Sequence, residues 1–66
     1  MIQDFKEHLE ARPFEPFSII TTGGKTYPVP TAEHAGLSPK GKRVVVWTDE
    51  GAGVTISGLH IASIEK

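Results

Sequence analysis

The sequence contains no cysteine among its 66 residues. Disulfide bonds, thiolate metal sites, iron–sulfur clusters and cysteine nucleophiles are therefore excluded. A chain this short buries only roughly 60% of the surface that its unfolded form exposes, so its core is small. With disulfides excluded, self-association is the further source of stability that we expect for a domain of this size.

An excess of charge of one sign and a long apolar run are also missing. Seven Lys and Arg residues face eight Asp and Glu residues, which gives a formal net charge of −1. Dedicated nucleic-acid-binding proteins usually carry a basic excess, so the charge balance disfavours nucleic acid as the partner. No apolar run approaches the roughly 20 residues of a membrane span, and the first residues lack the pattern of a signal peptide. We expect a cytoplasmic protein that does not contact a membrane.

The beginning of the chain predicts a helix over residues 1–12. Ile2, Phe5 and Leu9 recur at spacings of three and four, which places them on one stripe of a helix. Residues 13–16 (Pro-Phe-Glu-Pro) predict an extended connector, because proline ends a helix and restricts the residue before it. A helix of this length is not stable alone, so its apolar stripe must pack on the rest of the domain.

Two apolar segments around Gly23-Gly24 predict a β-hairpin that starts at residue 17. A two-residue turn would place prolines opposite the large apolar residues. A three-residue loop, residues 22–24, gathers the large apolar side chains on one face instead, with Phe17 opposite Val29 and Ile19 opposite Tyr27. We therefore predict the three-residue loop, with Gly24 in the left-handed conformation.

The rest of the chain predicts a loop and three further strands. The loop covers residues 31–42, and the strands cover residues 43–48, 54–57 and 61–65, with a tight corner at 58–60. The fold class is therefore mainly β, in the α+β class, with one domain over residues 1–66. The architecture expected for it is a short helix followed by a five-stranded, strongly bent antiparallel sheet or an SH3-like or Sm-like barrel over residues 17–65.

Short motifs at three places resemble those of a group of small bacterial proteins. The motifs are Arg12-Pro13-Phe14-Glu15-Pro16-Phe17, Gly23-Gly24 and His60-Ile61-Ala62-Ser63-Ile64-Glu65. Many members of that group carry His-Pro-Glu after the second strand, where this chain has Thr31-Ala32-Glu33. The group has no assigned activity, so the resemblance implies a fold and no mechanism. The element order also resembles Sm-like domains, although the short motifs by which Sm-like proteins bind RNA are absent.

The residue types that support catalysis or metal binding are present without the necessary spacing. His8, His34 and His60 lie too far apart for the usual zinc motifs, which leaves only a site assembled in space from Glu33, His34 and His60. Ser57 lies near His60, but no Gly-x-Ser-x-Gly motif surrounds it, and a serine there is more typical of a turn. The glycine pairs lie between strands and precede no helix, so they form no phosphate loop. We expect no enzyme, no catalytic residue, no metal site and no cofactor.

The strongest strand, residues 43–48, is apolar on both faces. If Val44 and Val46 face the core, Val45 and Trp47 face away from it. A strand that is apolar on both faces is normally covered on both, so we predict an interaction surface at Val45 and Trp47. This pattern favours a homo-oligomer, or an interface with another protein.

The only basic cluster consists of Lys40, Lys42 and Arg43. It could contact RNA or phosphate groups, or it could be a solvated loop that protects a strand end. Two functional hypotheses follow. The first is a non-enzymatic oligomeric scaffold or protein-interaction module, and the alternative is an Sm-like RNA-binding ring that uses the basic loop.

Overall fold

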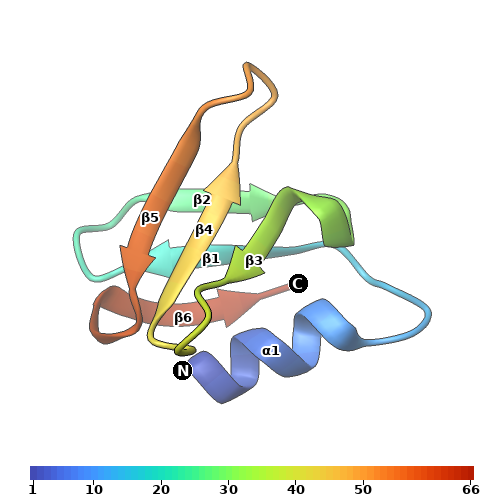
Figure 1. Cartoon of the computed structure of the whole chain (residues 1–66), viewed down its shortest axis with the longest axis horizontal. Coiled ribbons are helices and arrows are strands. Elements are labelled where there is room, and N and C mark those ends of the chain that lie inside the picture. The colour runs from blue at the N-terminus through green and yellow to red at the C-terminus, as the bar shows by residue number, and fades with distance from the viewer.

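The computed structural model describes residues 1–66 as one α-helix, six strands and two 3₁₀ turns (Figure 1). In chain order these are α1 (Ile2–Glu10), β1 (Phe17–Thr21), β2 (Thr26–Val29), η1 (Ala32–His34), β3 (Ala35–Leu37), β4 (Arg43–Trp47), β5 (Gly53–Ser57), η2 (Gly58–His60) and β6 (Ile61–Glu65). The mainly β, α+β class is confirmed. The one α-helix is too short and too polar to cross a membrane.

The strands form two antiparallel sheets of three strands each, in the orders β2-β1-β6 and β3-β4-β5. Their strands run in clearly different directions in Figure 1. The buried core residues come from strands of both sheets. The prediction of one five-stranded bent sheet or a closed barrel is therefore wrong. The 3₁₀ turn η1 interrupts the chain between β2 and β3, so the hydrogen-bonded ladder does not continue from one sheet into the other.

The prediction of a loop over residues 31–42 missed β3. This strand has only three residues, Ala-Gly-Leu, which have weak β-propensity on their own. It forms because it pairs with β4, which places Ala35 opposite Val46 and Leu37 opposite Val44. Ala35 is buried in the core as a result.

The hairpin prediction is confirmed in both its register and its turn. Phe17 pairs with Val29 and Ile19 with Tyr27, as the three-residue loop requires. Gly24 has a φ of 87°, in the left-handed region that favours glycine. Strand β2 lies at the edge of its sheet, with a partner strand on one side only. Pro28, which has no N–H group to donate, is tolerated at such an edge.

Helix α1 ends at Glu10, two residues before the predicted boundary. Ala11 is already extended, and the Arg12 guanidinium donates hydrogen bonds to the carbonyl oxygens of Leu9 and Ala11 at 3.2 and 2.7 Å. The connector therefore begins at residue 11. Pro13 disfavours the helical conformation at the residue before it, so the helix does not continue. Phe14 packs tilted against Phe17 with ring centroids 5.9 Å apart, which anchors the connector to β1.

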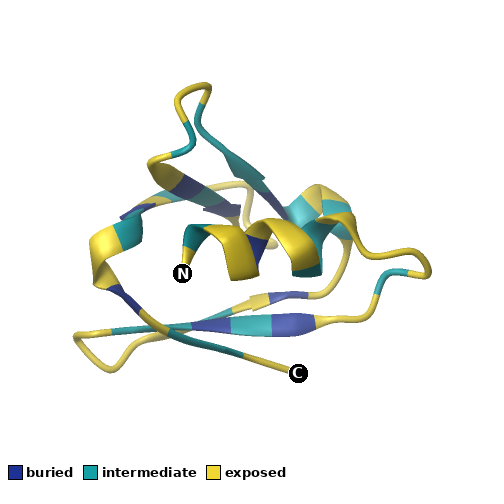
Figure 2. Ribbon diagram, turned by 90° about the horizontal axis from the view of Figure 1, so that it is seen from below, coloured by how far each residue is buried: buried dark blue, intermediate teal, exposed yellow.

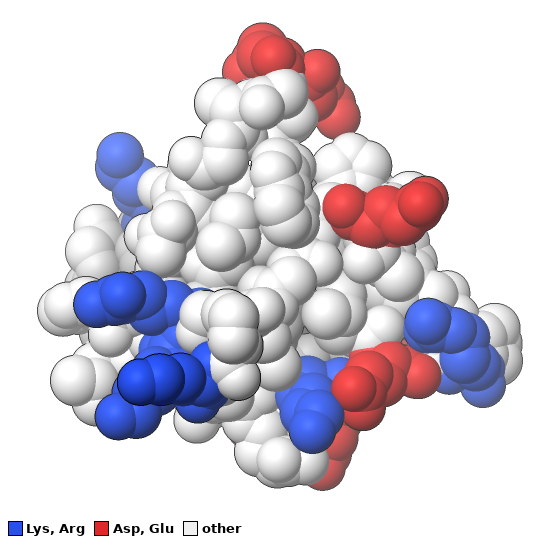
Figure 3. Space-filling view, viewed as in Figure 1, with Lys and Arg blue, Asp and Glu red and all other residues white.

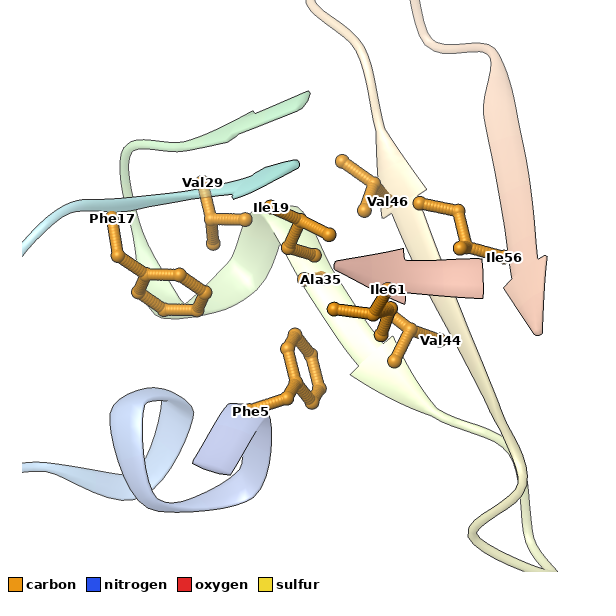
Figure 4. Packing of buried hydrophobic residues seen from close by; sticks show 9 residues of the cluster. All are labelled: Phe5, Phe17, Ile19, Val29, Ala35, Val44, Val46, Ile56 and Ile61. Atoms are coloured by element: carbon orange, nitrogen blue, oxygen red, sulfur yellow. The ribbon is translucent and has the colours of Figure 1, made fainter. Parts of the chain in front are cut away.

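The core joins both sheets and the helix. Nine buried apolar residues form it (Figure 4): Phe5, Phe17, Ile19, Val29, Ala35, Val44, Val46, Ile56 and Ile61. The helix lies across the open side between the two sheets (Figure 2) and inserts Phe5 between them. Phe5 meets Phe17 edge to face, with centroids 5.9 Å apart.

Candidate interaction surfaces

Strand β4 has two apolar faces, as its sequence predicts. Val44 and Val46 are 0% and 2% exposed, whereas Trp47 on the opposite face is 43% exposed and Val45 is half-buried. The helix does not cover this outer face, because it lies at the open side between the sheets (Figure 2). Within a single chain, therefore, nothing covers Trp47 completely.

Two glycines allow the Trp47 indole to lie across the sheet. A Cβ at Gly36 on β3 would lie 3.7 Å from the six-membered ring, and a Cβ at Gly53 on β5 would lie 3.7 Å from indole Nε1. The ring therefore reaches over both neighbours of β4. The result is an apolar patch, formed by the indole and Val45, on the outer face of the β3-β4-β5 sheet.

The predicted basic cluster lines a groove of about 940 Å³ at one end of β4. Lys40, Lys42 and Arg43 share this groove with the apolar side chains Ile2 and Leu59, and no acidic residue lines it. None of the three cations forms an ion pair within the chain. We call this groove, which is lined by Lys40, Lys42, Arg43 and Leu59 together with the start of α1, the basic groove.

Local hydrogen bonds hold the β3–β4 turn that carries these cations. The Ser38 hydroxyl oxygen accepts from the backbone N–H groups of Lys42 and Arg43 at 3.3 and 3.2 Å. Gly41 takes a φ of 69° and donates its N–H to the Ser38 carbonyl at 2.8 Å. The turn is therefore anchored at its base, while Lys40 and Lys42 extend into solvent.

The floor of the basic groove depends on a glycine. Gly58 donates its N–H to the Lys42 carbonyl at 3.0 Å, which ties η2 to the β3–β4 turn. A Cβ at this position would lie only 2.8 Å from Cγ1 of Ile2, so the first turn of α1 packs directly on the glycine. The next residue, Leu59, projects outward and is 89% exposed.

The opposite end of β4 carries acidic residues. Asp49 and Glu50 lie in the β4–β5 turn, where Gly51 has a φ of 87°. Asp49 Oδ1 lies 3.5 Å from Nε2 of His34, yet the Asp49 side chain is 93% exposed. We call Trp47, Asp49 and Glu50 together the acidic tip. The sequence did carry a signal for this surface, because two consecutive acidic residues follow closely after the single tryptophan.

The candidate metal ligands do not form a cluster. No three His, Asp or Glu side chains are placed to hold a metal ion, so Glu33, His34 and His60 do not assemble into a site. The Ser57 hydroxyl oxygen accepts the N–H of Leu59 at 3.3 Å and serves the corner of η2. The one clearly shifted acid is Glu15, where a hydrogen bond from Lys66 and the Lys66 charge lower the carboxyl pKa.

Comparison with known proteins found no matching family model, no matching curated protein and no matching solved structure. The resemblance to the small bacterial group stays a prediction.

Proposed function

We propose that the protein is a non-enzymatic, cytoplasmic homo-oligomeric scaffold, a small module that acts by binding other copies of itself or another protein. The observation that carries the proposal is the Trp47 indole, which is 43% exposed on an otherwise open sheet face. Tryptophan is enriched at the centres of protein interfaces and is seldom left in water without a partner. The flat apolar patch of the indole and Val45 provides a surface of this kind.

The sheet edges support the same proposal. The β2 edge carries Pro28, which cannot donate to another strand. The edges of β5 and β6 contain no proline and have no further strand beside them. Open edges of this kind readily pair with other chains, and packing against a second copy would cover them.

The fluorescence of Trp47 tests the proposal, because it is the only tryptophan in the chain. We expect acrylamide to quench it readily in dilute protein and less readily as the protein concentration rises, since association covers the indole. Thr26→Ala, an exposed threonine on β2 of the other sheet, should leave this concentration dependence unchanged. Quenching that is the same at every concentration, in a protein whose mass stays that of one chain, would rule out self-association through this face.

A second function is favoured by one observation, the basic groove. Three unpaired cations line it without an acidic residue, which suits the phosphate backbone of RNA. The alternative is therefore an Sm-like RNA-binding ring that uses the basic loop, in which the grooves of several copies add their charge. RNA affinity that falls steeply with salt, and is lost when Lys40, Lys42 and Arg43 are changed to glutamine, would support it. The net charge of −1 and the acidic tip favour the scaffold.

A further inference from the structure

We propose that the acidic tip of one copy binds in the basic groove of a second copy of this chain. The inference rests on the proposed function, because it names the surfaces through which the scaffold associates. Its basis is complementarity of charge and of exposed apolar side chains between two surfaces of the same molecule.

The two surfaces cannot meet within one chain. Arg43 begins β4, while Asp49 follows its end, so an extended backbone separates the groove from the tip by roughly 20 Å. Figure 3 shows acidic atoms at the end of the β4–β5 hairpin and basic atoms gathered on the opposite, lower part of the same face. A binding partner for either surface must therefore be another molecule.

The charges of the two surfaces are opposite in sign and differ little in number. The groove presents Lys40, Lys42 and Arg43, and none of them has an ion-pair partner. The tip presents Asp49, whose side chain is 93% exposed beside His34, and Glu50, which forms no ion pair. Opposite charges across an interface guide encounter and set the orientation of the two partners.

The apolar groups match as well. Only three large hydrophobic side chains are exposed: Met1, Trp47 and Leu59. Trp47 belongs to the tip, and the other two line the groove. Exposed ion pairs contribute little individually, so contact of the indole with Leu59 would supply the apolar part of the affinity.

The shapes of the two surfaces are also suited to each other. The β4–β5 hairpin projects beyond the rest of the fold in Figure 1, whereas the basic residues line a groove of about 940 Å³. Each copy carries one tip and one groove. Two copies can therefore pair reciprocally, or a series of copies can close into a ring.

The experiment reverses each surface separately and then combines them. One variant carries Lys40→Glu and Lys42→Glu, and the other carries Asp49→Lys and Glu50→Lys. Sedimentation velocity at low salt should show each variant alone associating about tenfold more weakly than the unmodified protein, or not at all. An equimolar mixture should recover the association. The acidic groove of the first variant then meets the basic tip of the second, and the acidic tip of the first meets the basic groove of the second.

The matched control carries Lys6→Glu and Lys25→Glu, which make the same change in net charge at exposed sites outside the groove. This control should associate as the unmodified protein does. Recovery in the mixture also shows that both variants are folded, and circular dichroism checks each one alone.

Three results would overturn the inference. If the reversed variants associate normally, the tip and groove are not the interface, although the proposed scaffold stands. If both variants are folded but their mixture stays monomeric, the pairing is wrong. If the unmodified protein is monomeric at all concentrations, the inference fails together with the homo-oligomeric form of the proposed function.

Discussion

Phe5→Ala is expected to destabilise the protein by about 3–5 kcal/mol, because truncating a buried phenylalanine leaves a cavity. Phe5 is 0% exposed and is the one residue of α1 that is fully buried in the core. A core this small contributes no more than about 3–5 kcal/mol in total. A large share of the molecules should therefore be unfolded at 25 °C, and urea titration followed by circular dichroism would measure it.

The matched control for Phe5→Ala is Lys6→Ala, one residue further along the same helix and exposed. It should change the free energy of unfolding by no more than about 0.5 kcal/mol. A loss below about 1 kcal/mol for Phe5→Ala would mean that the helix is not held by this side chain, and the account of the core would be wrong.

Gly58→Ala is expected to cost about 1–3 kcal/mol, because a methyl group there overpacks a filled site. The added Cβ would lie 2.8 Å from Cγ1 and 3.0 Å from Cδ1 of Ile2, and 3.3 Å from the Lys42 carbonyl oxygen. The Ile2 side chain, the first turn of α1 or the β3–β4 turn must then move. All three line the basic groove, so the same change should weaken self-association.

A double-mutant cycle with Ile2→Ala tests this explanation. Ile2→Ala removes both carbon atoms that approach Gly58 most closely, so it opens the space that the new methyl group needs. Gly58→Ala should therefore cost less in the Ile2→Ala background than in the unmodified protein, by about 0.5 kcal/mol or more. Equal costs in the two backgrounds would show that strain at Gly58 does not come from contact with Ile2.

Side-chain alternation made parts of this fold predictable. Only one loop length around Gly23-Gly24 places Ile19 opposite Tyr27, and the structure has that register. The alternation of β4 likewise separated the buried Val44 and Val46 from the exposed Trp47. In both cases the information is local, since a strand exposes its side chains to opposite faces with a period of two.

The division into two sheets was not predictable in this way. Strand β3 has three residues of weak propensity, and its pairing with β4 depends on where η1 redirects the chain. The basic groove combines residues from three separate segments: the start of α1, the β3–β4 turn and η2. The sequence showed the cations of the groove, but its apolar wall depends on Ile2 lying against Gly58, a contact between residues far apart in the chain.

The most direct test of the central claim, self-association, is native mass spectrometry of the protein purified at moderate salt without nuclease. We expect a defined multiple of the mass of one chain, free of nucleic acid. A species with the mass of a single chain at every concentration would contradict self-association. A multiple that carries nucleic acid would contradict the scaffold and favour the RNA-binding alternative.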